Sequence, residues 1–424
     1  MLLDGLKNNS KVTVWGYGKE GQAVTAFLQN RGCEVKVVED PLKEPLTGLV
    51  IKSPGISLYR NEIRIARQFS AYFTSATNLF LEAALSMENR PLLVGVTGTK
   101  GKSTTSSLIS FLFESFGNRV AFGGNIGYPI INYIEALDNY EIVVDEVSSY
   151  VAADLKYGFD ITVLLNLYPE HIDWHKTHEQ YFHDKLNIMR VRGADKPIVL
   201  NARDPLTRYY VKNPINPVYY NTIDGIHFRD GWFYDKRDKL FSTDVVPLRG
   251  EHNLENVCAA LTVMKLAGLE PKDCEEPLKE FHALPHRLQE LPEKNGIRFI
   301  DDSISTTPET ALAALRAFDG RRVVLIAGGF DRQQDYGELA DYAAKKYVPV
   351  VTIPQTGSRL AEEVRKRKGE VYEAADLKEA VSQAAKLASF GGFVLLSPAA
   401  PSYGIFKNFE ERGDFFAKCV REMP

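Results

Sequence analysis

The sequence predicts an α/β protein of three domains. Short apolar runs alternate with helix-length segments along most of the chain, a pattern typical of parallel strands joined by covering helices. Two glycine-containing turns, at residues 16–21 and 98–101, each follow a strand-like run and precede a helical segment. At about 100 to 200 residues per domain, the 424 residues are enough for three domains. The predicted boundaries are 1–90, 91–285 and 286–424.

The first domain opens with a strand (11–15, KVTVW), a turn with the pattern G-x-G-x-x-G, a helix and a second strand. Gly16, Gly18 and Gly21 form this turn, and an acidic pair, Glu39-Asp40, follows about twenty residues later, as in dinucleotide sites. An NAD site is one interpretation. Only some ninety residues precede the next motif, however, so we favour a smaller Rossmann-like module whose turn holds another diphosphate. A further strand ends at Ser53-Pro54-Gly55, where ligands of open α/β sheets collect.

Residues 92–105, LLVGVTGTKGKSTT, predict a buried strand, a phosphate loop and a helix in direct succession. Gly98 and Gly101 let backbone N–H groups converge on an anion, which the helix start also favours. Lys102 would meet the outer phosphates of a nucleotide, and the Ser103 hydroxyl would bind Mg²⁺. The spacing is one residue shorter than the usual eight-residue pattern, but the strand before it and the helix after it support nucleotide binding.

Two later strands of the second domain carry polar side chains toward this loop. EIVVDEVSSY (141–150) contains Glu146, and ITVLLNLYPEHIDWH (161–175) delivers His171 to its exit loop. The carboxyl ends of parallel strands lie at one edge of a sheet, and phosphoryl transfer needs an acidic group beside the nucleotide's Mg²⁺. We therefore expect Glu146 and His171 at the nucleotide site.

Two other polar segments of this domain allow more than one interpretation. We interpret His175, His178 and His183 as surface or capping histidines, with a zinc site on H-I-D-W-H as the alternative. A helix starts after residue 250, and either Asn253 or Asn256 could contact a base or cap the helix. The intervening residues 205–250 predict hairpins at a sheet edge, without evident chemistry.

The third domain is predicted to be doubly wound. Leu-Pro-His-Arg at 284–287 breaks the helical pattern, and four buried strands with helices between them follow. The strands end in polar or glycine-rich turns at 301–303, 328–332 and 397–398. Turns at the carboxyl ends of parallel strands form a crevice, and this one offers an arginine, hydroxyls and backbone donors, which suits a small carboxylate substrate.

Composition excludes several function classes. With 44% hydrophobic residues, 25% charged residues and a net charge of −4, nothing favours nucleic acid or a membrane surface as partner. The four cysteines, Cys33, Cys258, Cys274 and Cys419, are widely spaced, which predicts reduced thiols. The N-terminus lacks a signal-peptide core, and no run approaches the roughly 20 apolar residues of a membrane span. We expect a cytoplasmic monomer that acts on small molecules.

Taken together, the motifs resemble those of the Mur ligases, ATP-dependent amide-forming enzymes of peptidoglycan precursor synthesis, and within them the glutamate-adding group. The resemblance covers the whole chain, because TGTKGKST, the strand with Glu146, NLYPEHIDWH, HNLEN, LPHR and LLSPAAPS occur in the family's order. It implies a UDP-sugar domain, a central ATPase domain and a mobile domain that brings in the amino acid. The implied reaction adds glutamate to UDP-N-acetylmuramoyl-L-alanine with ATP and Mg²⁺, which argues against NAD.

The resemblance also implies roles for individual residues. Lys185, in YFHDKLNI, matches a lysine that the family carbamylates to bridge metal and water, although the segment alone is typical of a solvated helix lysine. The implied catalytic residues are Lys102, His171 and Lys185, and the implied metal ligands are Ser103, Glu146, His171 and Lys185. The implied ATP contacts are Gly98, Thr99, Lys100, Gly101, Lys102, Ser103, Thr104, Asn253, Asn256, Arg287 and Asp302. The implied substrate contacts are Gly16, Gly18, Ser53, Gly55, Asn125, Thr306, Arg332, Ser402 and Phe409.

The chain departs from the D-glutamate enzymes mainly at the amino-acid pocket. Those enzymes have the sequence D-S-K-A-T-N where residues 302–307 of this chain are DSISTT. They have a lysine at the position of Arg332 and a leucine at the position of Tyr403. A lysine and a planar arginine hold a carboxylate differently. DSISTTP, GGFDRQQDY and APSYG resemble the branch that adds L-glutamate, so we favour L-glutamate over D-glutamate. Val151, where the group tends to have glutamine, changes one substrate contact.

The mechanism implied by the resemblance has two steps. ATP phosphorylates the terminal carboxylate of the UDP-sugar to an acyl phosphate, and the glutamate amine then displaces phosphate. Two alternatives are a folate-polyglutamylating ligase of the same superfamily and a nucleotide-sugar-binding subunit without chemistry. The four residues Lys102, Glu146, His171 and Lys185 argue against the second alternative.

Overall fold

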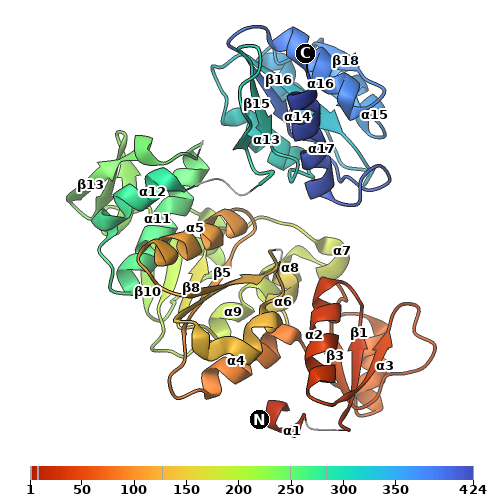
Figure 1. The fold of residues 1–424 in the computed structure, drawn as a ribbon, viewed down its shortest axis with the longest axis vertical. Helices are drawn as coiled ribbons and strands as arrows, with labels where there is room; N and C mark the ends of the chain where they lie inside the picture. The colour runs from red at the N-terminus through yellow and green to blue at the C-terminus, as the bar shows by residue number, and fades with distance from the viewer. Residues whose placement is uncertain (1, 7–8, 127, 249, 282–284, 424) are drawn as a thin grey trace. The chain divides into compact units, whose positions relative to one another are not determined.

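The computed structural model describes residues 2–6, 9–126, 128–248, 250–281 and 285–423 (Figure 1). The chain forms two compact units, the first covering Met1–Pro247 with His252–Phe281 and the second covering Leu248–Glu251 with His282–Pro424. The domain boundaries predicted at residues 90/91 and 285/286 stay predictions. Among the described residues, no helix is long and apolar enough to cross a bilayer.

The first unit begins with a parallel four-stranded sheet in the order β2-β1-β3-β4. Alternating apolar residues in β1 bury Val12 and Val14, and the glycine turn leads directly into helix α2. The strands are β1 (Lys11–Trp15), β2 (Glu34–Val38), β3 (Leu49–Lys52) and β4 (Tyr72–Thr74). The helices are α1 (Leu2–Gly5), α2 (Lys19–Asn30), α3 (Asn61–Gln68) and α4 (Ala76–Ser86).

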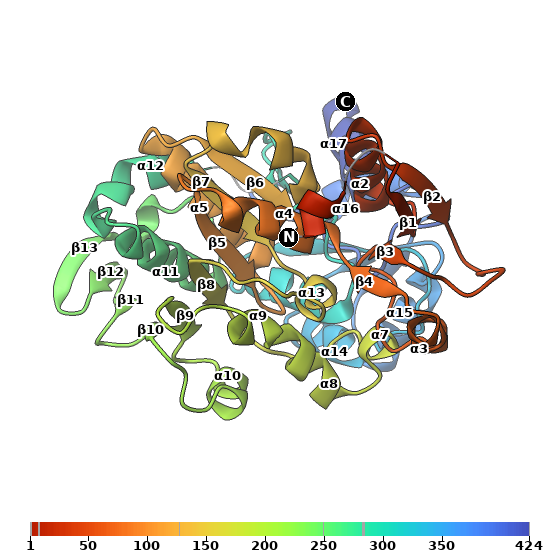
Figure 2. The same cartoon turned by 90° about the horizontal axis from the view of Figure 1, so that it is seen from below.

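A parallel six-stranded sheet, in the order β10-β9-β8-β5-β7-β6, forms the rest of the first unit's framework. The chain leaves β5 for β6 on one side and passes from β7 to β8 on the other, so the carboxyl ends of these central strands surround one crevice. Helix α5 packs on β5, β6 and β7 (Figures 1 and 2). The strands are β5 (Leu92–Thr97), β6 (Val120–Gly124), β7 (Ile142–Glu146), β8 (Ile161–Leu164), β9 (Ile198–Asn201) and β10 (Pro217–Tyr220).

The helices of this region cover the sheet, and a small antiparallel sheet adds the hairpins predicted within 205–250. Figures 1 and 2 show this sheet beside α11 and α12. Its strands are β11 (Ile226–Arg229), β12 (Trp232–Asp235) and β13 (Asp238–Ser242). The helices are α5 (Lys102–Ser115), η1 (Ile130–Asn139), α6 (Ser149–Ala152), α7 (Ile172–His175), α8 (His178–Lys185), α9 (Asn187–Arg190), α10 (Pro205–Tyr210), η2 (Thr243–Val245), α11 (Glu251–Leu266), η3 (Pro271–Cys274) and α12 (Glu275–Glu280).

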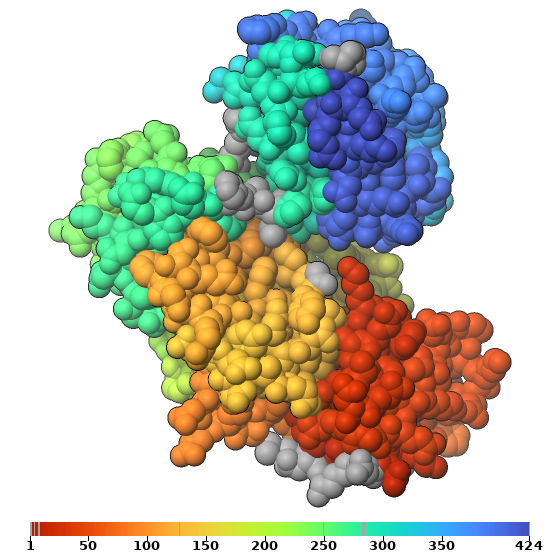
Figure 3. Space-filling model, viewed as in Figure 1, coloured from red at the N-terminus to blue at the C-terminus, as the bar shows by residue number. Residues whose placement is uncertain are grey.

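One hydrophobic core joins the two parallel sheets of the first unit. Val14 of β1 and Leu28 of α2 belong to the same buried cluster as Leu93 of β5 and Val143 of β7. Helix α2 packs on η1, and Figure 3 shows the red surface of the N-terminal residues meeting the yellow surface of the central ones. The glycine turn at the start of α2 is therefore held against the part of the unit that carries the phosphate loop.

The second unit contains a six-stranded sheet in the order β14-β15-β19-β16-β17-β18, parallel except at β14. Buried apolar clusters cover both of its faces, as expected for a doubly wound fold. It has two edge strands, β14 and β18, beyond the four that the sequence predicted. The strands are β14 (Gln289–Glu290), β15 (Arg298–Asp301), β16 (Val323–Gly328), β17 (Val350–Ile353), β18 (Val371–Glu373) and β19 (Phe393–Leu396). The helices are α13 (Pro308–Arg316), α14 (Gly337–Lys345), α15 (Gly357–Lys366), α16 (Leu377–Ala388) and α17 (Phe409–Glu422).

Candidate active site

The phosphate loop connects β5 to α5 with the geometry that the sequence predicted. Gly101 ends the loop at φ +83°, and a Cβ atom there would lie 2.5 Å from Oδ1 of Asn256. Only glycine fits that conformation and that close approach. Helix α5 starts at Lys102, whose Nζ donates to the Thr99 carbonyl at 3.0 Å. The N–H groups of the first turn face the loop, where an anion would bind.

Neighbouring side chains hold the loop in place. Asn166, just beyond β8, accepts from the Lys100 N–H at 2.8 Å and donates to the Lys100 carbonyl at 3.1 Å. The Thr99 hydroxyl lies 2.8 Å from the buried hydroxyl of Tyr181. These bonds fix the loop before any ligand arrives, which lowers the entropic cost of binding a phosphate.

Glu146 ends β7, the strand adjacent to β5, so the sheet brings it beside the phosphate loop. Its side chain is buried, and Oε1 accepts a hydrogen bond at 2.9 Å from the exposed Asn125 amide. The other oxygen, Oε2, is buried without a hydrogen-bond partner. A buried carboxylate oxygen without a partner costs free energy, so this atom is set up to receive a cation or a donor from a ligand.

His171 stands at the exit of β8 in a left-handed conformation, with φ +55°. Its ring lies 5.0 Å from the ring of Tyr150, and its Nε2 lies 3.7 Å from a carboxylate oxygen of Glu170, which also pairs with Lys100. The side chain is 46% exposed, and partial desolvation, together with the charges of Lys185 and Lys102, lowers the pKa of His171 despite Glu170. The neutral imidazole that this favours is the form that binds metals.

Lys185, at the end of α8, is 1% exposed and donates from Nζ to the Gly98 carbonyl at 3.0 Å. Burial, and then the positive charge of Lys102, lower the pKa of Lys185 well below its usual range. The lowered pKa favours the neutral, nucleophilic form of the amine beside the phosphate loop. A solvated lysine, which the segment alone suggested, is excluded.

The residues at this edge fit a magnesium ion held jointly with a nucleotide. Among the residues that the structure describes, no three His, Cys, Asp or Glu side chains converge as a metal cage. Mg²⁺ bound with nucleotide phosphates uses only one or two protein oxygens and completes its shell with phosphates and water. The partnerless oxygen of Glu146 and the buried hydroxyl of Ser103 supply such ligands. A separate all-protein site is not needed.

Asn253 and Asn256 both lie inside α11, so neither caps it. The amide of Asn256 donates to Oδ1 of Asn253 at 3.1 Å, and Asn256 packs directly on Gly101. The structure therefore brings this pair to the phosphate loop. Thr104 lies half-buried in the first turn of α5.

The glycine turn gathers the predicted sugar-nucleotide contacts at the carboxyl end of β1. Gly16 has φ +90°, and its carbonyl accepts from the Ser53 hydroxyl at 2.9 Å. Gly18 caps α2 without a side-chain hydrogen bond, so helix N–H groups stay available to an anion. A Cβ atom on Gly55 would meet nothing within 4 Å. The loop therefore leaves open space at this strand end.

In the second unit, the predicted residues surround the carboxyl ends of β15, β16 and β19. Asp302 is buried and accepts from the Ser397 hydroxyl at 2.7 Å. Burial raises the pKa of Asp302 to about 7, although Ser305, Ser397 and the nearby Arg287 oppose the rise. Asp302 thus changes protonation near neutral pH, which makes it an adjustable hydrogen-bond partner.

The turns after β16 and β19 bring Arg332 to Tyr403. The exposed guanidinium of Arg332 lies 5.7 Å from the centre of the Tyr403 ring, which packs edge-on at 6.2 Å against Phe330. An arginine stacked on an aromatic ring keeps its fork free for a carboxylate. Thr306 lies half-buried after β15, Ser402 is buried just before Tyr403, and the Phe409 carbonyl accepts from Ser303 at 2.8 Å.

The interpretation of His175 as a surface or capping histidine is wrong. His175 is 0% exposed, with Nδ1 2.6 Å from Asp184 Oδ2 and Nε2 3.0 Å from the Ser149 hydroxyl. His178 and His183 are exposed, as predicted. The error has a physical cause, because α7 and α8 fold over the ring and this tertiary packing leaves no local sequence signal.

Two further carboxyl groups, on half-buried Glu20 of the glycine turn and buried Asp145 of β7, were not predicted from the sequence. Each has an oxygen that is buried without a hydrogen-bond partner. Burial raises the pKa of Glu20 to about 7, and burial with the charges of Glu20 and Glu146 raises the pKa of Asp145 to about 8. An apolar strand with two acidic residues at its end was the available signal.

Replacing Asp145 with asparagine is expected to stabilise the protein, increasingly so as the pH rises. The folded-state pKa of about 8 exceeds the unfolded value of 3.8, so the native protein loses stability between these values. The slope approaches at most about 1.4 kcal/mol per pH unit, and asparagine removes it. Denaturant unfolding of both proteins at about pH 5 and about pH 8 checks this. A gain that is equal at the two pH values would contradict the raised pKa.

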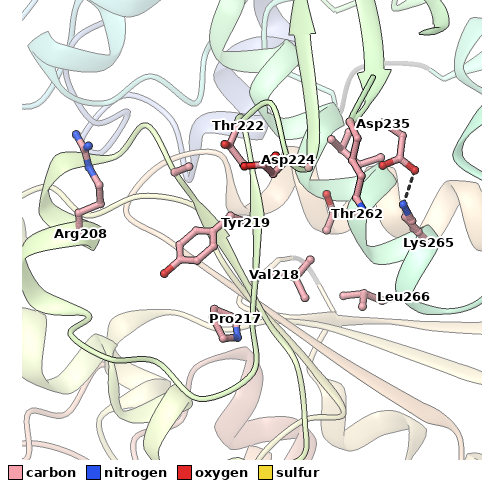
Figure 4. Close-up of a pocket in the computed structure, with 14 residues that line it drawn as sticks. Arg208, Pro217, Val218, Tyr219, Thr222, Asp224, Asp235, Thr262, Lys265 and Leu266 are labelled. Atoms are coloured by element: carbon pink, nitrogen blue, oxygen red, sulfur yellow. Dashed lines mark hydrogen bonds and ion pairs between the residues drawn. The ribbon is translucent and has the colours of Figure 1, made fainter. Parts of the chain in front are cut away.

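A separate cavity of about 740 Å³ lies between β10, the small sheet and α11 (Figure 4). Tyr219, Val218 and Leu266 line it, and an ion pair between Asp235 and Lys265 stands at one side. None of the predicted site residues lines this cavity. This cavity is therefore separate from the predicted nucleotide site at the strand ends.

The fold and the site define a phosphate-loop enzyme with a nucleotide site at the edge of a parallel sheet. Residues 96–264 match the model of the Mur ligase middle domain, and residues 286–400 match that of the Mur ligase glutamate ligase domain. The chain belongs to the Mur ligase family. As a member of it, the chain is an ATP-dependent ligase that forms an amide bond. The predicted family and enzyme class are confirmed.

Two relatives illustrate the similarity over the full length. A UDP-N-acetylmuramoyl-L-alanine--L-glutamate ligase of Xanthomonas euvesicatoria pv. vesicatoria is 36% identical, covering 97% of this chain and 95% of the relative. An enzyme of the same name from Salinispora tropica is 34% identical, covering 100% and 99%.

Solved structures share the fold at lower identity. The MurF ligase of Thermotoga maritima, crystallised in complex with ADP, aligns with a TM-score of 0.64 at 18% identity over 98% of this chain and 96% of that one. The UDP-N-acetylmuramate-alanine ligase of the same organism gives 0.62 at 17% identity, covering 97% and 99%. The predicted fold class is confirmed.

Proposed function

We propose that this enzyme joins L-glutamate to the alanine carboxyl group of UDP-N-acetylmuramoyl-L-alanine, with ATP as the energy source, in peptidoglycan precursor synthesis. One observation carries the proposal: buried Lys185, the partnerless Oε2 of Glu146 and the Lys102 amine surround one phosphate loop. The names of the full-length relatives support the substrates. ATP and UDP-linked sugars are cytoplasmic metabolites, so we propose the cytoplasm as the place of reaction.

The first step transfers a phosphoryl group. A carboxylate oxygen of the muramoyl-alanine attacks the γ-phosphorus of ATP, the bond to ADP breaks, and an acyl phosphate forms. Loop N–H groups and Lys102 hold the phosphates, and the Asn125 amide is exposed for the sugar substrate. Glu146, Ser103 and His171 would hold Mg²⁺, which would neutralise charge on the transferring group.

Lys185 is suited to become a carbamate. Its neutral amine can add to CO₂, forming an N–C bond and releasing a proton, which converts a buried base into an anionic ligand. The carbamate would lie near Lys102, whose positive charge would stabilise an anion at this position. Such an anion could bind a metal ion. Carbamylation would also remove the free-energy cost of burying this amine, for which the described residues provide no ion pair.

The second step forms the amide. The glutamate amine attacks the acyl carbon, phosphate leaves, and the amine loses a proton. We propose that Arg332, supported by the Tyr403 ring, binds a carboxylate of glutamate, while Thr306, Ser402 and Phe409 complete its pocket. Arg287, Asp302, Asn253 and Asn256 would contact ATP.

Phosphate release with UDP-N-acetylmuramoyl-L-alanine, ATP and each glutamate enantiomer tests the substrate assignment. We expect at least about 100-fold higher kcat/KM with L-glutamate, equivalent to about 2.7 kcal/mol of discrimination. Equal rates, or a preference for D-glutamate, would move the assignment to the D-glutamate enzymes. Absence of turnover with both enantiomers would refute the proposed reaction and favour a non-catalytic sugar-nucleotide-binding protein.

A further inference from the structure

A chain of hydrogen bonds, buried at all of its members except Tyr59, links three parts of the first unit. The Tyr59 hydroxyl, on the loop after β3, donates to Asp184 at 2.7 Å from Oδ1 and 2.8 Å from Oδ2. Asp184 Oδ2 lies 2.6 Å from Nδ1 of His175, and Nε2 of that ring lies 3.0 Å from the Ser149 hydroxyl. Asp184, His175 and Ser149 are each less than 5% exposed. A network of this kind fixes the relative positions of its side chains, because each lost hydrogen bond would leave a buried polar group without a partner, at a cost in free energy.

The chain ends next to groups of the nucleotide site. Asp184 directly precedes Lys185, and Ser149 begins α6 three residues after Glu146. Asp184 accepts from the Tyr59 hydroxyl and, at 2.8 Å, from the Gln180 side-chain amide, so its carboxylate acts as the acceptor in this chain. The imidazole therefore donates from Nδ1 to Asp184, and its Nε2 shares a hydrogen bond with the Ser149 hydroxyl. The ring thus bridges α6, which follows the strand carrying Glu146, and α8, which carries Lys185.

The loop at the other end belongs to the glycine-turn sheet. The Trp174 indole donates to the Pro54 carbonyl at 3.0 Å, and the Ser57 hydroxyl donates to the Trp174 carbonyl at 2.6 Å. Tyr59 packs edge-on to Trp174 at 6.0 Å. The loop of residues 53–59 begins with Ser53, the expected diphosphate contact. Hydrogen bonds connect this loop to Trp174, the residue next to His175.

We propose that His175 and Tyr59 are positioning residues that couple UDP-sugar binding at the Ser53 loop to the placement of Lys185 beside the phosphate loop. The inference rests on the proposed function for the identity of the sugar ligand. Neither side chain needs to touch a reacting atom. A sugar nucleotide that orders residues 53–59 would also order Asp184 and Lys185, and by reciprocity a bound nucleotide would tighten sugar binding.

Calorimetry of the full-length protein measures this coupling. The Kd for UDP-N-acetylmuramoyl-L-alanine is determined with and without a non-hydrolysable ATP analogue and Mg²⁺. We expect the analogue to tighten sugar binding at least about fivefold in the wild type and less than about twofold in Tyr59→Phe. Tyr72→Phe is the matched control, because its hydroxyl accepts from Lys156 at 2.8 Å, away from Lys185. The control should keep the wild-type ratio.

Two substitutions of His175 separate positioning from general packing. The amide of asparagine overlays Nδ1 and can keep the bond to Asp184, whereas glutamine overlays Nε2 and keeps only the bond to Ser149. His175→Asn should retain kcat within about tenfold of wild type, and His175→Gln should lose at least about 100-fold in kcat with a smaller change in KM. Melting temperatures of the two variants report packing separately from turnover.

The outcomes distinguish the inference from the proposed function. If the wild type neither binds the sugar nucleotide nor turns over, the proposed function fails. If it does both but Tyr59→Phe keeps the wild-type coupling ratio, or the wild type shows no coupling, the positioning role is refuted. The positioning role would also be refuted if both His175 variants lost kcat equally and in proportion to their loss in melting temperature.

Discussion

Replacing Lys102 with alanine is expected to lower kcat by about 10³-fold or more, because it removes the one side-chain cation that reaches from α5 over the phosphate loop. The charge on the transferring phosphoryl group would lose a stabilising partner that no backbone group replaces. Folding should be preserved, since the side chain is half-buried at a helix start. Phosphate release with saturating ATP and UDP-sugar measures the loss.

Lys212→Ala is the control for this experiment. Lys212 is exposed and lies over the Tyr209 ring, so its removal should leave turnover within about twofold of wild type. Unchanged turnover in Lys102→Ala would show that the loop does not hold the reacting phosphates. A loss in both variants would point to a general effect on the protein instead.

Replacing Lys185 with methionine is expected to abolish turnover, with a loss of about 10³-fold or more, and at the same time to maintain or raise stability. Methionine fills the same volume but cannot form a carbamate or hold a metal. The wild-type amine is buried with a strongly lowered pKa, so the native state carries a desolvation cost that methionine removes. Activity and denaturant unfolding at neutral pH measure the two effects.

Lys196→Met provides the comparison. Lys196 pairs with Asp160 at 3.2 Å, at the amino ends of β8 and β9, on the edge of the sheet opposite the phosphate loop. Its replacement should leave kcat nearly unchanged and lower stability by up to about 1 kcal/mol, as for a partly exposed ion pair. If Lys185→Met kept activity, Lys185 would be structural. If it unfolded the protein, Lys185 would be a packing residue.

The fold was largely predictable because its signals are local. Apolar runs such as Leu92–Val96 and glycines such as Gly101 fix strands and turns through short-range rules, and the structure places both as expected. The edge strands β14 and β18 escaped prediction because they are short and mostly exposed, so they lack a buried apolar run. Edge strands depend on pairing more than on their own sequence.

The candidate site was predictable in part. Glu146 and His171 follow buried strands, so strand order alone brings them to the phosphate loop. Lys185 and His175 carry no such signal, because their burial comes from helices that fold over them. A helical spacing of four places Lys185 on the face of the buried Tyr181, which was the available hint. Without the family resemblance, Lys185 would have been assigned to solvent.

In the proposed reaction, the site activates a carboxylate by phosphorylation before an amine attacks it. The most direct test supplies UDP-N-acetylmuramoyl-L-alanine labelled with oxygen-18 in the alanine carboxylate, together with ATP and L-glutamate, and analyses the released phosphate by mass spectrometry. We expect one oxygen-18 atom in each phosphate, transferred from the carboxylate through the acyl phosphate. Unlabelled phosphate, with amide formed at the normal rate, would contradict it.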